Sequence, residues 1–314
     1  MANIVILEAH HTNPGDLSWD AINRLGEVTI YQRTTQDQLV ERALNADILI
    51  TNKLKITWDV LSRLPRLKLI HQLATGTDNI DKTAAAESGV IVMNAVGYST
   101  NAVAQHVFAL VLELSSLVSI HNDEVQKGGW NRSGDWCHMV QTPIELSGKT
   151  LGIIGFGQIG QAVAQLGMAF GMDIKAVSKH ASEDKYPGIS IVSIDELTET
   201  SDVITIHSPL TPENKGMIDS RFLNKMKKSS LLINTARGGH VNEVDLRETL
   251  VNHKIAGAAL DVLINEPPEA DHPLIGVKNC IITPHIAWTA FESRRRLIDI
   301  VANNISKFLA ANPI

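Results

Sequence analysis

In the middle of the chain stands the run Leu151-Gly152-Ile153-Ile154-Gly155-Phe156-Gly157-Gln158-Ile159-Gly160. Its apolar first half is typical of a buried strand, and a helix-like segment, 161–170, follows its last glycine at once. A strand-to-helix turn with this glycine spacing is typical of a dinucleotide-binding site. The first glycine allows the tight turn, the second lets the backbone approach a pyrophosphate, and the third lets helix and strand pack closely. The phosphates would face the helix N-terminus, where Gln158 and Ile159 lie, whereas the alternative is a glycine turn that binds nothing.

Short strand-like runs alternate with helix-like segments along the chain, which is typical of parallel α/β architecture. The expected strands are 3–7, 28–31, 47–51, 67–72, 90–94, 150–154, 173–177, 202–207, 230–234, 256–260 and 280–283, with helical patterns at 35–46 and 81–88. Apolar residues at helical spacing from Val103 to Val118 predict a core helix that opens a second domain. The helix-like segment 291–311 is expected to return to the first domain.

The sequence therefore predicts two doubly wound parallel-sheet domains with a cleft between them. Residues 1–100 and 288–314 would form a discontinuous substrate domain, and residues 101–287 would form the dinucleotide-binding domain. The excursion 128–148, which contains Trp130 and Trp136, has no clear periodicity and is expected to pack on another molecule. It indicates a homodimer.

Composition limits the classes of partner. The 314 residues are 44% hydrophobic and carry a net charge of −6, with no basic stripe, which argues against nucleic acid or an anionic membrane surface. The run 3–7 reads as a strand, so no signal peptide is expected, and the apolar region 106–120 is too short to span a bilayer. Cys137 and Cys280 lack metal or redox spacing and are expected to be reduced thiols of a cytoplasmic protein. The histidines show no ligand spacing, so no metal site is predicted.

Five ordered blocks of sequence carry a family resemblance. They are Ala74-Thr75-Gly76-Thr77-Asp78-Asn79-Ile80-Asp81, the Gly155 motif, Asn234-Thr235-Ala236-Arg237-Gly238, Leu260-Asp261-Val262 with Glu266-Pro267, and Pro284-His285-Ile286-Ala287. Over its whole length the chain resembles the D-isomer-specific 2-hydroxyacid dehydrogenases. The Trp130 and Trp136 segments and Trp288 are most similar to glycerate dehydrogenases, also called hydroxypyruvate reductases. The resemblance implies a Rossmann-type nucleotide domain, a flavodoxin-like substrate domain and a homodimer.

Three residues are candidates for the chemistry of reducing a 2-oxo acid. Arg237 follows a strand at the sheet edge where ligands bind, and its guanidinium can fork onto a carboxylate and a carbonyl oxygen. His285 also follows a strand, and an imidazolium there can donate a proton during reduction and accept it during oxidation. Glu266 would stabilise the charged imidazole. A surface salt bridge, a loop histidine and a solvated glutamate are the alternatives, but the three residues in this order match the family's catalytic residues.

Further residues are assigned to substrate or cofactor. Thr75 and Gly76 are expected to form either a nest of N–H groups for the substrate carboxylate or a plain tight turn, and Trp288 is assigned to the substrate by the resemblance. The cofactor-binding residues, besides those of the glycine motif, are Ser178, Lys179, His207, Pro209, Thr235, Ala236, Arg237 and Asp261, of which Asp261 is expected to hold the nicotinamide carboxamide. Glu243 and Asp245 are interpreted as solvated or capping charges.

The end of the strand 173–177 departs from the usual pattern. A carboxylate expected there would bind the ribose 2′-hydroxyl of NAD, but Ser178 and Lys179 stand in its place. A serine beside a lysine can accept a 2′-phosphate, so the sequence favours NADP(H), with a permissive NAD(H) site as the alternative.

The chain is thus predicted to reduce a small 2-oxo acid, such as hydroxypyruvate or glyoxylate, with NAD(P)H to a D-2-hydroxy acid. The alternative is a nicotinamide-dinucleotide-sensing protein that uses the same fold to bind protein partners. The intact Arg237, Glu266 and His285 argue against that alternative.

Overall fold

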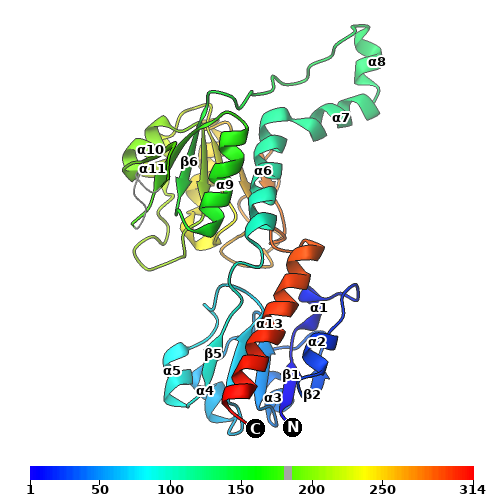
Figure 1. Cartoon of the computed structure of the whole chain (residues 1–314). Coiled ribbons are helices and arrows are strands. Elements are labelled where there is room, and N and C mark those ends of the chain that lie inside the picture. Colours follow the sequence, from blue (N-terminus) through cyan, green and yellow to red (C-terminus); the bar gives the residue numbers. More distant parts are fainter. Residues whose placement is uncertain (180–185) are drawn as a thin grey trace. The chain divides into compact units, whose positions relative to one another are not determined.

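The computed structural model describes residues 1–179 and 186–314. The chain divides into two compact units, which are described separately below (Figure 1). Unit 1 comprises Met1–Ser99 and Trp288–Ile314, and unit 2 comprises Thr100–Ala287. Each unit is built on one parallel sheet with helices packed on it. The predicted α/β class with two parallel sheets is confirmed.

Unit 1 contains a five-stranded sheet in the order β2-β1-β3-β4-β5. Its strands are β1 (Asn3–Ile6), β2 (Glu27–Ile30), β3 (Ile48–Thr51), β4 (Leu69–Gln72) and β5 (Ile91–Met93). Its helices are α1 (Ala9–Thr12), α2 (Asp20–Asn23), α3 (Leu39–Ala43), α4 (Trp58–Ser62), α5 (Lys82–Glu87) and α13 (Phe291–Ala311). This strand order is that of flavodoxin-like folds.

Alternate residues of the central strands of unit 1 face two separate cores, because successive side chains of a strand point to opposite faces. Ile4 and Ile48 pack with α2 and α13 on one face. Val5 and Leu49 pack with α3, α4 and α5 on the other. Strands buried on both faces need continuous apolar runs, which explains the sequences of β1 and β3.

The described part of unit 2 contains a seven-stranded parallel sheet in the order β12-β11-β10-β9-β6-β7-β8. Its strands are β6 (Thr150–Ile154), β7 (Asp173–Val177), β8 (Ile189–Ile191), β9 (Val203–Ile206), β10 (Leu231–Asn234), β11 (Gly257–Leu260) and β12 (Cys280–Ile282). Its helices are α6 (Thr100–Ser116), α7 (Val118–Gln126), α8 (Gly129–Ser133), α9 (Gln158–Ala169), α10 (Ile194–Thr200), α11 (Ser220–Lys225) and α12 (Glu243–Val251). Read from β8, this is the strand order of the dinucleotide-binding Rossmann fold, extended by one strand.

α6 and α9 cover one face of this sheet, and α11 and α12 pack in the core on the opposite face. Leu151 and Ile153 of β6 pack with α6 and α9, whereas Ile154 of β6 packs with α11 and α12. The order reverses between β6 and β9, so the loops after these two strands diverge to opposite faces. Such a switch point, at the carboxyl ends of the strands, is where open α/β sheets bind ligands.

Some details differ from the sequence predictions. β8 was not expected, and the helix expected over 35–46 spans only Leu39–Ala43. The apolar stripe that begins at Val103 stops packing in the core near Leu114. Leu117 adopts a left-handed conformation, and Val118 at the start of α7 is 61% exposed, so the prediction of a core role for Val118 is wrong.

In the described residues no single helix is long and apolar enough to cross a membrane. α6 and α7 pass that test only as a pair bent by 56°. Seven residues of α6 are buried, and the apolar ones pack in the core of unit 2.

Candidate active site

The three glycines of the central motif lie at the turn from β6 into α9. Gly155 has a φ of 95°, and a Cβ there would lie 2.5 Å from the backbone nitrogen of Ser208. A Cβ at Gly160 would lie 2.3 Å from the carbonyl oxygen of Gly155. Gly155 and Gly160 are therefore required by the fold itself.

Gly157 is different, because a Cβ there would meet no protein atom within 4 Å. Its φ of −80° is also open to other residues. Gly157 is the N-cap of α9, and no side chain caps the N–H groups there. Folding does not explain a glycine at this position, but the close approach of a pyrophosphate to the helix N-terminus does. These residues fit a dinucleotide.

Unpartnered polar atoms gather next to this turn. Among the described residues, the buried side-chain atoms without a hydrogen-bond partner include His207 Nε2, Ser208 Oγ, Thr235 Oγ1 and His240 Nδ1. All four residues follow β9 or β10 at the carboxyl edge of the sheet. Burial lowers the pKa of His207 to about 3, so its imidazole is neutral. Buried polar groups are normally satisfied, so such a cluster indicates a place where a ligand supplies the partners.

The turn that carries Arg237 is held by Asn234, the last residue of β10. The Asn234 side chain accepts a hydrogen bond from Ala236 N at 3.0 Å and donates one to Arg237 O at 2.9 Å. The Arg237 guanidinium donates to Ala236 O at 2.8 Å. Asn234 is fully buried, so it fixes the backbone from which the half-buried Arg237 projects. The sequence prediction used Asn234 only as part of a motif.

The loop after β12 is organised by Asp261, which directly follows β11. Its carboxylate accepts hydrogen bonds from Thr283 Oγ1 at 2.6 Å, Ile286 N at 2.8 Å and Ala287 N at 2.9 Å. His106 Nε2 lies 3.5 Å from the same carboxylate. Burial opposes ionisation, but these hydrogen bonds hold the pKa of Asp261 below its ordinary value. Asp261 is 1% exposed and thus stabilises the loop, while its predicted contact with nicotinamide stays a prediction.

His285 lies within this loop with a φ of 55°, a left-handed conformation that is uncommon for residues other than glycine. Its Nδ1 lies 2.6 Å from Glu266 Oε2, and the other oxygen of Glu266 accepts from Leu263 N at 3.1 Å. The side chains of His285 and Glu266 are 27% and 29% exposed. Strained residues persist where the surrounding structure holds them, and they cluster at active sites.

Arg237 and His285 emerge from the same edge of the sheet. Asn234 of β10 is in register with Leu260 of β11, and Leu260 is in register with Ile282 of β12. Arg237 and His285 each lie three residues beyond the end of the preceding strand. Two strand spacings separate β10 from β12, which is about 10 Å. A small substrate can be reached from both residues across such a distance.

The candidate residues of unit 1 have their own contacts. Thr75 Oγ1 donates to Ala95 O at 2.8 Å, and Asn94 Nδ2 donates to Thr75 O at 2.6 Å, which ties the loop after β4 to the chain after β5. Gly76 follows in this loop. The Trp288 ring packs edge-on against Tyr98, with centroids 6.3 Å apart. Substrate binding by Thr75, Gly76 and Trp288 stays a prediction.

Ser178 and Lys179 directly follow β7, as expected, and no carboxylate stands between this strand and the end of the described segment. Ser178 is half-buried and Lys179 is exposed. The Thr211 hydroxyl, and to a smaller degree the Lys179 charge, hold the pKa of Glu213 below its ordinary value. Lys179 therefore acts electrostatically on the loop that follows Pro209.

The structure corrects one reading of the sequence. Glu243, interpreted as a solvated or capping charge, is 8% exposed and accepts hydrogen bonds from Ile264 N at 2.8 Å and from His272 Nε2 at 3.1 Å. Asp245 does lie at the helix N-terminus, where it accepts from Ser220 N at 2.8 Å. Among the described residues no group of His, Cys, Asp or Glu has the arrangement of a metal site.

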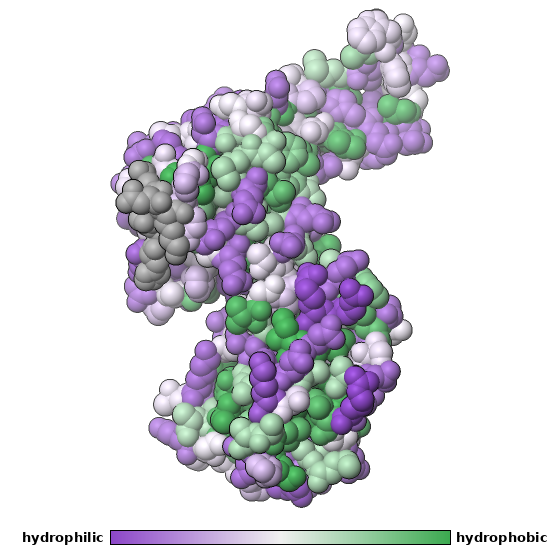
Figure 2. Space-filling model, in the orientation of Figure 1, coloured by the Kyte–Doolittle hydropathy of each residue, from purple (hydrophilic) through white to green (hydrophobic). Residues whose placement is uncertain are grey.

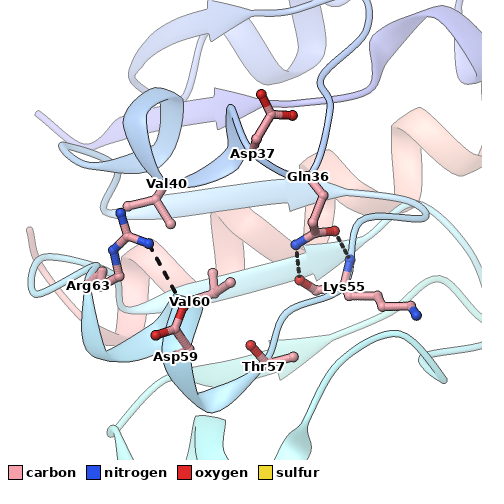
Figure 3. A pocket seen from close by; sticks show the side chains of 8 residues that line it. All are labelled: Gln36, Asp37, Val40, Lys55, Thr57, Asp59, Val60 and Arg63. Atoms are coloured by element: carbon pink, nitrogen blue, oxygen red, sulfur yellow. Dashed lines mark hydrogen bonds and ion pairs between the residues drawn. The ribbon is translucent and has the colours of Figure 1, made fainter.

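A pocket of about 340 Å³ lies on unit 1, away from the predicted residues (Figure 3). Gln36 and Lys55 exchange hydrogen bonds of 2.8 and 2.9 Å at one side of it, and Arg63 lies 3.9 Å from Asp59 at the other. No candidate catalytic or cofactor-binding residue lines this pocket.

Comparison with known proteins places the chain in a family. The model of the D-isomer specific 2-hydroxyacid dehydrogenase NAD binding domain matches residues 108–287. The chain is 40% identical over 319 residues to the hydroxypyruvate reductase of Blautia hydrogenotrophica, covering 99% of this chain and 98% of that one. It is also 40% identical over 286 residues to the glycerate dehydrogenase of Methylorubrum extorquens, covering 90% and 89%.

The fold agrees with this. The solved structure of an acyclic imino acid reductase in complex with NADPH and D-arginine has a TM-score of 0.87 and 31% identity, and the match covers 99% of this chain and 98% of that one. The predicted resemblance, enzyme class and NAD(P) cofactor are confirmed, and a protein that only senses the dinucleotide is not favoured. The chain belongs to the D-isomer-specific 2-hydroxyacid dehydrogenases and is an NAD(P)-dependent oxidoreductase of that family.

Proposed function

We propose that this oxidoreductase reduces hydroxypyruvate or glyoxylate to the D-2-hydroxy acid, with His285 as the proton donor. The observation that carries the assignment is the hydrogen bond of 2.6 Å between His285 Nδ1 and Glu266 Oε2. It is supported by the left-handed backbone conformation of His285, in the loop that Asp261 holds, and by the position of Arg237 at the same sheet edge.

The hydrogen bond to Glu266 leaves one nitrogen of His285 for the substrate. A carboxylate accepts only, so Nδ1 carries a proton, and the tautomer is assigned from this partner. Nε2 then faces the reaction. As imidazolium, His285 donates the Nε2 proton to the carbonyl oxygen as it becomes an alkoxide during reduction, and in oxidation neutral Nε2 accepts that proton from the hydroxyl. Glu266 keeps the charged ring oriented.

Arg237 is assigned to the substrate carboxylate. Its planar guanidinium can donate two parallel hydrogen bonds, which fixes the direction of the 2-oxo group as well as its place. The buried Asn234 limits movement of the backbone from which Arg237 projects. An anchored substrate loses less entropy at the transition state, and this favours reaction.

The dinucleotide is assigned to the edge formed by β6, β9 and β10. Gly155, Gly157, Gln158, Ile159 and Gly160 would hold the pyrophosphate at the N-terminus of α9. His207, Pro209, Thr235 and Ala236, with Asp261 and the Arg237 backbone, would line the remainder. When bound, the reduced nicotinamide supplies the hydride.

Ser178 and Lys179 support a preference for NADP(H). Replacing Ser178 with Asp is expected to shift the ratio of kcat/KM for NADPH over NADH by at least about tenfold towards NADH, because a carboxylate repels the 2′-phosphate and accepts from a free 2′-hydroxyl. The matched variant Ser178→Asn, which adds no charge, should shift the ratio far less. A native enzyme that already prefers NADH by more than about tenfold contradicts the assignment.

The relatives named hydroxypyruvate reductase and glycerate dehydrogenase support the choice of substrate. The test is a panel of hydroxypyruvate, glyoxylate, pyruvate, 2-oxoisocaproate and an imino acid, each with NADPH and NADH, followed by the loss of absorbance of the reduced cofactor. We expect the highest kcat/KM with hydroxypyruvate or glyoxylate. A higher value with a bulky 2-oxo acid or with the imino acid contradicts the proposal.

A homodimer is proposed from α7 and α8. In unit 2 these helices stand clear of the parallel sheet, and apolar side chains alternate with polar ones on their surface (Figures 1 and 2). None of the residues of α7 is buried. Exposed apolar side chains in α7, α8 and the chain that follows them are Val118, Ile120, Val125, Trp130, Trp136, Met139 and Val140. Large apolar side chains gathered on an exposed segment are typical of an interface.

Analytical ultracentrifugation should give twice the chain mass of 34.3 kDa for the native protein. The double variant Val125→Glu with Trp130→Glu should sediment as a monomer, whereas Val244→Glu, which alters an exposed valine on α12, should not. A monomeric native protein overturns the assignment.

The free thiols of Cys137 and Cys280 support a cytoplasmic location.

A further inference from the structure

Apart from the pair of Glu266 and His285, unit 2 contains a buried pair of a glutamate and a histidine. Glu243 is the first residue of α12, and His272 lies in the loop that follows β11. Glu243 Oε2 lies 3.1 Å from His272 Nε2, and Glu243 Oε1 accepts from Ile264 N at 2.8 Å. Both side chains of the pair are at most one-tenth exposed. We propose that Glu243 and His272 are positioning residues that hold the loop 261–274 so that Glu266 meets His285.

The hydrogen bonds of His272 identify its tautomer. Its Nδ1 accepts from Leu274 N at 3.3 Å, so this nitrogen carries no proton. Nε2 must then carry the proton and donate it to the Glu243 carboxylate. His272 is thus neutral and has no free nitrogen for proton transfer. The pair binds two parts of the loop together and does not act in catalysis by itself.

The contact with Ile264 connects this pair to Glu266. Ile264 N donates to Glu243, and the preceding Leu263 N donates to Glu266 Oε1 at 3.1 Å. Glu266 Oε2 receives the hydrogen bond from His285 Nδ1 at 2.6 Å. Two successive peptide N–H groups therefore bind the two carboxylates. A shift of Ile264 would move the donor that orients Glu266.

The same peptide lies against the turn that carries Arg237. A Cβ at Gly238 would lie 2.0 Å from the carbonyl carbon of Leu263 and 2.4 Å from Ile264 N, so the two backbones are in close contact. Displacement of this loop would therefore disturb the neighbour of Arg237 as well as Glu266. Geometry errors of about 1 Å at an active site can lower the rate by about a hundredfold.

A purely structural role for Glu243 is the competing explanation. A carboxylate in the first turn of a helix is favoured by the helix dipole. However, Asn242 already caps α12 by accepting from Val244 N and Asp245 N at 3.2 Å, and Asp245 provides a second carboxylate in the first turn. Asp245 binds Ser220 N, not the loop of Glu266. Asp245→Asn is therefore a matched control for the helix role.

The test follows the hydrogen bond of His285 directly by proton NMR of the protein without substrate. A proton in a short hydrogen bond between an imidazole and a carboxylate resonates at low field. The His285 resonance is assigned by its loss in Glu266→Gln and in His285→Asn. We expect Glu243→Gln and His272→Leu to shift or broaden it, and His272→Gln, which keeps an N–H near the position of Nε2, to restore it. Asp245→Asn should leave it unchanged.

Kinetics supply a second readout, and it depends on the proposed function. With hydroxypyruvate, Glu243→Gln and His272→Leu should lower kcat by about ten- to a hundredfold, while KM for NAD(P)H stays within about twofold. If Glu243 acts through Glu266, the double variant Glu243→Gln with Glu266→Gln should be no more than about twofold slower than Glu266→Gln alone. Asp245→Asn should keep the native kcat.

Two results overturn the proposal: a low-field resonance that is unchanged in both Glu243→Gln and His272→Leu, or losses of kcat that multiply in the double variant. If Glu243→Gln does not fold, the comparison of His272→Leu with His272→Gln decides the question. A native protein that reduces no 2-oxo acid refutes the proposed function alone, because the resonance still reports whether the pair positions Glu266.

Discussion

Replacing Glu266 with Gln should slow catalysis without unfolding the loop. Glu266 lies 2.6 Å from His285 Nδ1 and 3.1 Å from Leu263 N. Glutamine keeps the shape of the side chain and one acceptor oxygen for the His285 proton. It removes the negative charge that favours imidazolium over neutral imidazole. The variant therefore tests the charge of Glu266 separately from its position.

The expected size follows from the hydrogen bond. Both side chains are less than one-third exposed, at 27% and 29%, so solvent screens their interaction only partly. A hydrogen bond to a charged group contributes about 1.5–3 kcal/mol and a neutral one about 0.5–1.5 kcal/mol. The difference of about 1–1.5 kcal/mol corresponds to about a tenfold change in rate, at about 1.36 kcal/mol per factor of ten.

The loss should appear in both directions of the reaction. In the proposed mechanism an imidazolium is consumed in reduction and formed in oxidation, and glutamine cannot stabilise its charge as a carboxylate does. We therefore expect kcat/KM to fall about tenfold in reduction and in oxidation.

The assay is kcat/KM in both directions, using hydroxypyruvate with NAD(P)H and D-glycerate with NAD(P)+. His285→Ala is the companion variant and should lose most activity while it still binds the cofactor. A native kcat/KM in Glu266→Gln would refute the role of Glu266. A loss as large as that of His285→Ala would refute a role limited to stabilising the charged ring.

Three more predictions test the substrate clamp, the cofactor site and the acid stability of unit 1. Arg237→Ala should lower kcat/KM for hydroxypyruvate by at least about a hundredfold, because charged hydrogen bonds of about 1.5–3 kcal/mol each are lost. The Kd of NAD(P)H should stay unchanged. A native kcat/KM would exclude Arg237 as the residue that binds the substrate carboxylate. Gly157→Ala should keep the native Tm, because the added Cβ meets no protein atom, but it should weaken NAD(P)H binding about tenfold or more in a fluorescence titration. Gly160→Ala should instead lower the free energy of unfolding by about 1–3 kcal/mol, because its Cβ overpacks the turn. A lower Tm in Gly157→Ala contradicts the assignment. Burial lowers the pKa of His71 to about 4, below the ordinary 6.5, so the folded state favours the neutral ring. Above about pH 6.5 the ring is neutral in both states and stability is not reduced. As the pH falls to about 4, the free energy of unfolding should decrease by up to about 3 kcal/mol. Urea unfolding at several pH values should show this loss in the native protein and not in His71→Leu, and equal pH dependence of the two would contradict it.

The central glycine motif and several elements could be predicted because their signals are local. Gly155, Gly157 and Gly160 mark a turn, a helix N-terminus and a close packing contact, all within a few residues of one another. β6, β7 and α13 have the predicted bounds, because their apolar patterns extend over the full length of each element. β8 has three residues, too few to show a period, and was not predicted.

Which apolar residues after Asn101 are buried depends on tertiary contacts. The apolar spacing from Val103 to Val118 is uniform in the sequence, yet only its first part packs in the core, against α9, β10 and β11. The left-handed Leu117 ends α6, and α7 then continues with its apolar residues exposed. Periodicity predicts that a helix has an apolar face, but it does not say what that face packs against.

The candidate site divides in the same way. The sequence by itself determined that Arg237 and His285 follow strands, because strand and turn patterns are properties of short segments. Only the fold decided that β10, β11 and β12 are neighbours, that Asp261 holds the His285 loop, and that Glu243 is buried against Ile264. A glutamate in the first turn of a helix looks the same in sequence whether it is solvated or buried. Its environment depends on a loop that lies elsewhere in the chain, and chain folding alone brings the two together.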